Sequence, residues 1–397
     1  MARRYLFLIF IVAFNGLVFA GTEGGYVSNN PAAQLSIFKD GLYGRIANKI
    51  QFAKSELTDK QNEGEVSKSS IDDWFIPSGL LAYKKDNWGL FFSYSTFLAG
   101  IHEYPDGSME YKDKLCDATE AKLGARVYDA QKAENGFKDA FALAFGGAYK
   151  INSWCSLGLG LIYKEGTKVT NGSFKSLHPA LKDVVVNIER ETDGYEIMLT
   201  SDFAPYDDLH FGFVLNSGGK YMYEFSKAVD TRPIQNPYKV GNTERKDVPP
   251  SIITGISYKI IPEFTIEAAF GYYFYKEIKV KDIDGDTNND YDNAYDITLY
   301  GKYRIAQFLG VFAGITYNDS QYNLKTNTDS SHKTDAYILL GGFNIGLSKR
   351  LLIDLSVSHR IMLPEEGEDV SVPGKTTRIE YDGSITDVTI GLLYKFF

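Results

Sequence analysis

The chain has 397 residues and a formal net charge of −9, and it contains 28 Tyr, 26 Phe and 37 Gly but only 12 Pro. The negative charge argues against a nucleic-acid-binding protein, because nucleic acids select basic surfaces. Two cysteines, Cys116 and Cys155, are too few for a disulfide framework, and the sequence leaves open whether they pair. The many aromatic residues favour strands and the aromatic belts of membrane interfaces.

The N-terminus has the pattern of a secretory signal peptide. Two arginines at positions 3–4 precede an apolar run over 5–14, and Val18-Phe19-Ala20 forms a small-residue cleavage site. The run is too short for a spanning helix. We therefore expect residues 1–20 to be a signal peptide and exclude them from the fold.

From Gly44 the chain alternates between apolar segments and short polar turns. Each turn is followed at once by an aromatic residue or Leu, and the six turns lie at 83–88, 149–154, 204–209, 258–264, 303–308 and 346–351. Long hydrophilic stretches separate the pairs, at 102–135, 166–192, 227–248, 279–292, 319–333 and 364–380. With 44–57 and 381–397 added at the ends, the pattern predicts about 14 strands, the even number typical of bacterial barrels.

Side-chain parity distinguishes the two faces of these strands, because successive strand residues point to opposite sides. In 385–397 every second residue from Val388 to Phe396 is apolar or aromatic, and 295–304 and 351–360 repeat the pattern. Similar alternation places His210 and Glu267 on the polar face. A charge that faces lipid at mid-bilayer costs about 2–4 kcal/mol, so the polar face must line the lumen.

These patterns predict an all-β fold: a transmembrane antiparallel β-barrel over residues 44–397, located in the bacterial outer membrane. The alternative interpretation is a secreted array of β-sandwiches. One stretch, Met109–Asn135, is rich in Ala, Lys and Glu with spaced apolar residues, which predicts a helix within an extracellular loop.

The chain ends within its last strand, which must pair with the first because an open edge in lipid leaves backbone groups unpaired. Tyr394 stands two residues before Phe396, an arrangement that resembles the C-terminal signal of outer-membrane barrels, with Phe397 as one extra residue. We expect the barrel-assembly machinery and outer-membrane lipid as partners, no nucleic acid, and a monomeric barrel.

No catalytic or metal-binding motif stands out. The five His residues form no HExxH pattern, and GxSxG and phosphate-binding Gly loops are absent from the sequence. The acidic stretch 282–290 lacks the Gly and Glu that a calcium-binding EF-hand loop requires. We predict no enzymatic activity, no metal and no cofactor. Lys302, Arg304 and Arg360 face inward and are candidates to attract a carboxylate, although plain polar lining is the other interpretation.

The sequence also resembles a known family. Asn30-Pro31-Ala32 resembles the Asn-Pro-Ala motif in the N-terminal plug of the FadL/TodX family, outer-membrane transport proteins for long-chain fatty acids and other hydrophobic compounds. The segments 248–273 and 294–320 and the terminal strand are similar to family strands in order and turn placement. The resemblance implies a fourteen-stranded barrel plugged by its N-terminal segment, here the short residues 21–43.

The resemblance further implies passive uptake of a long-chain fatty acid or similar hydrophobic molecule, with release sideways into the membrane. An apolar chain gains about 0.8 kcal/mol per buried CH₂, so an apolar lumen retains it. Gly89, Ala99 and Gly100 are candidates for positions where the wall opens. Two other functions stay open: a surface scaffold or adhesin that works through loops 102–135 and 227–248, and a general porin.

Overall fold

The computed structural model describes residues 30, 32–33, 39–59, 66–96, 100–104, 127–231, 238–281, 287–288, 291–319, 334–372 and 375–397. The signal-peptide prediction therefore lies outside the described residues. The strands are β1 (Gly41–Asp59), β2 (Val66–Lys85), β3 (Trp88–Thr96), β4 (Gly100–Tyr104), β5 (Tyr128–Asn152), β6 (Cys155–Ser176), β7 (Val184–Tyr206), β8 (Leu209–Asn216), β9 (Met222–Asp230), β10 (Thr243–Lys246), β11 (Ser251–Ile261), β12 (Phe264–Tyr273), β13 (Val280–Lys281), β14 (Thr287–Asn288), β15 (Ala294–Ala306), β16 (Leu309–Asp319), β17 (Ala336–Gly346), β18 (Leu351–Met362), β19 (Glu365–Val372) and β20 (Lys375–Lys395). A single turn of 3₁₀ helix, η2, spans Tyr275–Glu277.

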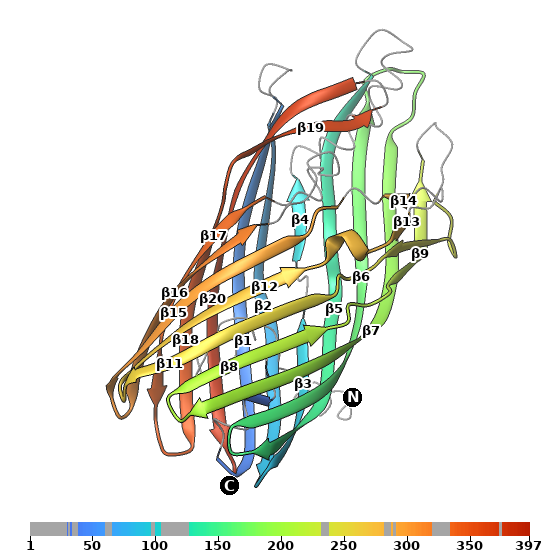
Figure 1. Cartoon of the computed structure of the whole chain (residues 1–397). Coiled ribbons are helices and arrows are strands. Elements are labelled where there is room, and N and C mark those ends of the chain that lie inside the picture. The colour runs from blue at the N-terminus through green and yellow to red at the C-terminus, as the bar shows by residue number, and fades with distance from the viewer. Residues whose placement is uncertain are drawn as a thin grey trace, which may run out of the picture.

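The strands form one antiparallel sheet that closes into a barrel (Figure 1). Closure is made by the last strand: β20 pairs with β1 from Tyr43↔Lys395 to Asp59↔Ile379, and with β18 on its other side. The ring contains 14 strands, which confirms the predicted barrel, and short extra strands lie outside it. No helix in the described part of the chain has the length and apolar character to cross a membrane.

All six predicted turns are confirmed. They join β2 to β3, β5 to β6, β7 to β8, β11 to β12, β15 to β16 and β17 to β18, and they lie at the lower end of the barrel with the C-terminus (Figure 1). Short turns mark the periplasmic end of outer-membrane barrels, so the upper end is extracellular.

The predicted parity is confirmed as well. On β15, Ile297 and Leu299 are each 50% exposed on the outer surface, whereas Thr298 between them is 6% exposed. Glu267 is buried on the inner side of β12, and Asp354 on that of β18. The outer face is apolar because it contacts lipid, and the inner face accommodates the charges.

Aromatic side chains frame the apolar band at two levels. At the extracellular level the Tyr163 and Tyr195 rings are 5.0 Å apart, and at the periplasmic level Trp154 stacks on Phe203 at 6.2 Å. Exposed leucines occupy β6 between these levels over residues 157–161. An apolar band between two aromatic girdles is the lipid-facing surface of an outer-membrane barrel, so the chain spans that membrane many times.

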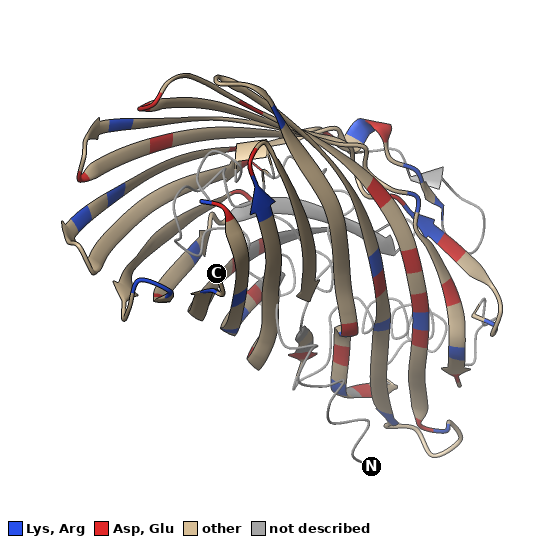
Figure 2. Cartoon of the chain, turned by 90° about the horizontal axis from the view of Figure 1, so that it is seen from below, with Lys and Arg blue, Asp and Glu red and all other residues tan. Residues whose placement is uncertain are grey.

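Strands β5, β6 and β7 are the longest of a group that continues far beyond the extracellular girdle, with 25, 22 and 23 residues. Above the girdle their outer faces carry charged residues, including Glu165, Glu191 and Asp193. The alternating acidic and basic residues are visible along the long strands at the right of Figure 2. On the β15–β18 side the strands end near the girdle, so the barrel has one tall wall.

Two expectations require correction. The helix predicted over Met109–Asn135 is wrong for Tyr128–Asn135, which begin β5 and pair with β6 from Tyr128↔Ser176 onwards; residues 105–126 lie outside the described part. Much of the hydrophilic stretch 166–192, expected as a loop, is also strand. In both places cross-strand pairing overrides a polar composition that favours helix or loop.

The first strand begins at Gly41 and not at Gly44. Gly41 has a φ of +144°, and a Cβ atom there would come within 2.0 Å of the Phe397 carbonyl oxygen. Only glycine adopts this conformation without strain, and only glycine leaves room for the chain terminus. Gly41, at the start of β1, thus packs closely against the backbone of Phe397.

Candidate functional site in the barrel lumen

The inner face of β7 runs along the lumen from the extracellular to the periplasmic end, so its residues serve to locate the parts of the site. From the extracellular to the periplasmic end its inward residues are Val184, Val186, Ile188, Arg190, Thr192, Gly194, Glu196, Met198, Thr200 and Asp202, most of them buried. Apolar and polar levels therefore follow one another along a single strand.

The N-terminal motif is bound to this strand inside the barrel. The Asn30 amide nitrogen donates to the Ser201 carbonyl oxygen at 2.8 Å, and the Ala32 amide donates to Thr200 Oγ1 at 3.4 Å. Asn30 Oδ1 also accepts the Ala33 amide at 3.2 Å, as an N-cap residue does. Asn30 and Ala32 are fully buried. Asn30 thus shapes the segment and anchors it, while Pro31 lies outside the described residues.

We call the place on β7 where Asn30 and Ala32 bind the seat of the N-terminal motif. It depends on a glycine on the neighbouring strand. Gly158 pairs with Thr200 across β6 and β7, and a Cβ atom at Gly158 would lie 2.4 Å from Thr200 Oγ1. Atoms cannot approach so closely, so a side chain here would move the hydroxyl that accepts from Ala32. The seat is therefore specified by residues from three distant parts of the sequence.

A buried apolar cluster on the inner wall includes Met198, which is the next inward residue from Thr200 in the extracellular direction along β7. We call this cluster the lumen patch, and its buried members come from β1, β2, β3, β7 and β8: Tyr43, Leu80, Ala82, Phe91, Met198 and Val214. The Phe91 ring packs on backbone that lacks side chains, because Cβ atoms at Gly146 and Gly160 would approach its Cζ to 2.4 and 3.2 Å. At the lumen patch the inner wall is apolar, whereas the lumen of a porin is polar.

The other half of the periplasmic end is polar. A half-enclosed chamber of about 620 Å³ is lined by the inner ends of β8, β11, β12 and β15–β18. Its acidic and basic residues are Asp207, Asp208, Lys259, Glu263, Glu267, Lys302 and Arg304, and His210 also lines it. The structure thus brings together Lys302 and Arg304, two of the three cations predicted from the sequence.

The three predicted cations differ in their surroundings. Arg304 donates to the Pro262 carbonyl oxygen at 2.9 Å and lies 3.8 Å from Glu263 at the rim. Arg360 lies on β18 beside Ile338 and Ile385 and does not line the chamber. The three cations therefore do not form one site.

A second hollow, of about 680 Å³, lies on the outer wall. Leucines such as Leu90, Leu159 and Leu199 surround Gly147, which leaves a depression because it has no side chain. Gly89 also lines it, but its strand is regularly paired on both sides, with Lys84 and Ala148. This outer groove faces the membrane just outside the seat of the N-terminal motif.

Among the described residues, pairing with β2 is incomplete near the other predicted glycine. The β2–β3 ladder ends at Ser78↔Ser95, and pairing with β2 resumes on β4 at Ser70↔Glu103. Gly100 lies between these two points and pairs with β5 on the other side. Pro77 lies at the start of the interruption and has no N–H to donate. Gly100 therefore lies beside this gap in the described pairing, while Ala99 lies outside the described residues.

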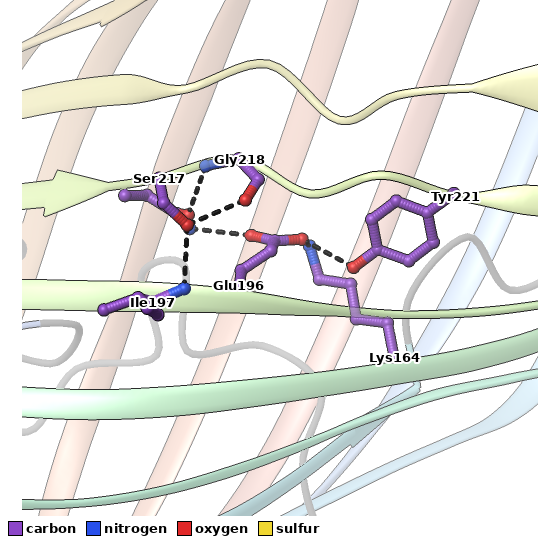
Figure 3. A network of polar contacts seen from close by, with 7 residues as sticks. Lys164, Glu196, Ile197, Ser217, Gly218 and Tyr221 are labelled. Carbon is purple, nitrogen blue, oxygen red and sulfur yellow. Dashed lines mark hydrogen bonds and ion pairs between the residues drawn. The ribbon is translucent and has the colours of Figure 1, made fainter.

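One polar group was not anticipated from the sequence. Glu196 is 1% exposed, and its carboxylate accepts from Lys164 Nζ, from the Tyr221 hydroxyl at 2.8 Å and from the Asn216 amide at 2.8 Å (Figure 3). We call these four residues the Glu196 cluster. Tyr221 reaches it across bare backbone, since a Cβ at Gly194 or Gly219 would come within 2.6 Å of its ring.

The sequence did carry a signal for this cluster. Glu196 stands at an inward position of an apolar alternating segment, Tyr195 to Leu199, where a charge requires a partner. Its partners come from three other places in the chain and are defined only by strand register. Within the described ranges, no group of three or more His, Cys, Asp and Glu side chains is placed to hold a metal ion.

Comparison with known proteins gives matches of structure only. No family model and no curated protein matches the sequence. A FadL homologue of Pseudomonas aeruginosa matches with a TM-score of 0.71 and 13% identity, over 96% of both chains. The toluene transporter TodX of P. putida matches with a TM-score of 0.68 and 12% identity, over 97% of this chain and 99% of that one.

A third solved structure agrees with these two. The toluene transporter TbuX of Ralstonia pickettii has a TM-score of 0.62 and 11% identity, over 98% of this chain and 99% of that one. At such identities the likeness is one of fold. It confirms the resemblance expected from the sequence: the chain has the fold of the FadL/TodX outer-membrane transport barrels over nearly its whole length.

Proposed function

We propose that the protein takes up hydrophobic small molecules across the outer membrane by passive transport, the class that includes long-chain fatty acids and aromatic hydrocarbons. The observation that carries this proposal is the lumen patch, an apolar inner cluster that includes Met198, the inward neighbour of the Thr200 side chain that accepts from Ala32. A polar pore gains nothing from such a surface, whereas a hydrophobic ligand gains about 0.8 kcal/mol for each CH₂ it buries there.

The structural neighbours support the same class of cargo. TodX and TbuX are described as toluene transporters, and CymD, with a TM-score of 0.56, as a monoaromatic hydrocarbon channel. The shared fold alone does not define the cargo. Together with the lumen patch, it favours a transporter over the adhesin and porin alternatives.

The route begins at a second apolar cluster in the tall extracellular wall. Its buried members come from the ends of β5, β6, β7 and β9: Val127, Tyr128, Phe174, Val184, Val186, Ile188 and Phe225. Along the inner face of β7 this cluster precedes the Glu196 cluster, and the lumen patch follows. A hydrophobic molecule would thus pass from one apolar surface to the next.

Release sideways into the membrane is the route we propose for exit. Among the described residues, few backbone pairs join β2 to the end of β3 and to β4, and Gly100 lies beside this region. Movement of the N-terminal segment, anchored by Asn30, would free the lumen for this step. Gly89, in a regularly paired strand, contributes to the outer groove and not to this opening.

The candidate cations Lys302 and Arg304 have a different part in this proposal. They lie in the periplasmic chamber, where a carboxylate would also meet Glu263 and Glu267. We assign them to a hydrated floor of the lumen, with Arg360 outside it.

The test uses purified barrel in detergent and cells that carry it, comparing wild type with Asn30→Ala and with deletion of residues 21–29. We expect saturable binding of a fluorescent hydrophobic probe in all three and slower uptake in both variants. Asn87→Ala, in a periplasmic turn, is the control and should match wild type.

A folded wild-type barrel that binds no hydrophobic probe contradicts the proposal. High conductance in planar bilayers would instead indicate a porin, and loss of cell adhesion after deletion of residues 231–242, between β9 and β10, an adhesin.

A further inference from the structure

The inner wall beside the lumen patch carries a cation, Lys164, whose charge is neutralised by a carboxylate. Lys164 Nζ donates to Glu196 Oε1, and the same oxygen accepts the Tyr221 hydroxyl at 2.8 Å (Figure 3). The second oxygen accepts the Asn216 amide at 2.8 Å. Both carboxylate oxygens therefore have donors, and the Lys164 charge is neutralised within the wall.

The Lys164–Glu196 pair lies next to the lumen patch, where we propose that the transported molecule binds. Met198, the next inward residue after Glu196 on β7, belongs to the lumen patch. Ile162 stands opposite Glu196 in the β6–β7 register and packs against the same patch. Any molecule that lies on the patch thus has the Lys164–Glu196 pair at its extracellular end.

Two further inward cations beside apolar surfaces are paired in the same way. Arg190 lies 3.4 Å from Glu244 and 5.0 Å from the centre of the Phe225 ring in the extracellular cluster. Arg45, from the strand that contributes Tyr43 to the lumen patch, lies 3.5 Å from Asp354. At these three places the apolar surfaces meet neutralised ion pairs, which offer a carboxylate no partner.

We propose that Glu196 determines specificity by withholding Lys164 from anionic ligands, so that the lumen patch selects uncharged hydrophobic molecules over carboxylates with the same chain. An ionised carboxylate that enters the patch loses its water and finds no unpaired cation at the Lys164–Glu196 pair, and burying an unpaired charge is costly. An ester, alcohol or hydrocarbon loses far less. This inference rests on the proposed function and narrows its substrate class.

The experiment compares two probes with the same acyl chain, palmitate and its uncharged methyl ester, at pH 8, where the acid is ionised. Affinities are measured on purified barrel in non-ionic detergent. Wild type should bind the ester at least about tenfold more tightly than the acid, a factor typical of one polar group that is buried without a partner.

Glu196→Gln is the diagnostic variant. It preserves the shape of the side chain and an acceptor for Tyr221, but it removes the negative charge that neutralises the Lys164 ammonium. We expect acid binding to strengthen about tenfold while ester binding stays within about twofold. The double variant Glu196→Gln/Lys164→Met should restore the wild-type preference, because it removes the released cation as well.

Three outcomes are distinguishable. If neither probe binds to folded wild-type barrel, the proposed function is wrong. If both probes bind wild type equally, or if Glu196→Gln leaves their ratio unchanged in a barrel that retains heat-resistant migration, the inference is wrong and the proposed function stands. Lys302→Met covers the opposite orientation of the ligand: a loss of acid binding there would place the carboxylate in the periplasmic chamber and overturn the inference.

Discussion

Among single residues, Gly158 has an effect on the N-terminal segment that its place on β6 does not suggest. Gly158→Ala would put a methyl group 2.4 Å from Thr200 Oγ1, the acceptor of the Ala32 amide. We expect the hydroxyl to move and the segment to lose a hydrogen bond worth about 1 kcal/mol. Faster proteolysis of the N-terminal segment and slower uptake of a hydrophobic probe would show this.

The control for this prediction is Gly310→Ala. Gly310 also lies on the inner wall, but a Cβ there would meet its nearest neighbour at 3.7 Å, an ordinary contact. This variant should behave as wild type. Equal behaviour of the two variants would show that the contact with Thr200 does not hold the segment.

The sequence allowed us to predict which residues point into the lumen, but not which residues they contact. Alternation assigned His210 and Glu267 to the inner face, and the motif at Asn30 indicated a plug. The acceptors of Asn30 and Ala32, Ser201 and Thr200, are about 170 residues away, and strand register alone brings them there. Periodicity carries no information on such distant pairs.

At the level of elements, three neighbouring strands are interrupted at one height. The breaks lie at 217–221 between β8 and β9, at 247–250 between β10 and β11, and at 274–279 after β12. Other groups take over the missing pairing: the Ile197 amide donates to Ser217 Oγ at 2.8 Å, and Phe274 donates to the Pro250 carbonyl at 3.0 Å. Isolated backbone bonds and the Ser217 side chain therefore hold the wall together at this height.

Ser217→Ala tests this dependence. It removes the hydroxyl that accepts the Ile197 amide, and leaving a backbone N–H without its partner costs about 1–3 kcal/mol. We expect earlier proteolysis within β9 and β10 and a lower midpoint of thermal unfolding, followed by the loss of heat-resistant migration. Ser173→Ala, on the outer face of β6, is the matched control. If both variants unfold alike, the hydroxyl does not support the break.

The residue pattern along the long strands explains why their extracellular parts were not predicted as strand. Apolar alternation predicted strands well within the membrane, where the outer face contacts lipid. Above the girdle the apolar parity reverses: on β7, Val186 and Ile188 point inward while Glu189 and Glu191 point outward. The period of two persists there, but it is not recognisable by a search for apolar outer faces. The helix predicted near Asn135 failed for the same reason.

For the whole molecule, closure depends on the chain terminus. The Phe396 amide donates to the Leu42 carbonyl at 2.9 Å, and the Phe396 ring packs at 5.0 Å on Tyr394, while Phe397 is 65% exposed. We expect deletion of Phe397 to reduce the yield of assembled barrel slightly and deletion of both phenylalanines to reduce it strongly. Heat-modifiable migration of outer-membrane fractions measures this. Equal loss in both would assign the signal to the final residue.

The placement of the whole barrel in the membrane gives the last prediction. Leu159 lies on the outer face of β6 between the two aromatic girdles, and Glu165 lies on the same face above Tyr163. Arginine at a mid-membrane position costs about 2–4 kcal/mol, and close to zero outside the band. Leu159→Arg should therefore reduce the free energy of unfolding in lipid vesicles by about 2–4 kcal/mol, while Glu165→Arg should change it little. Because both substitutions introduce the same side chain on one strand, a similar cost at both positions would mean that the girdles do not mark the edges of the bilayer.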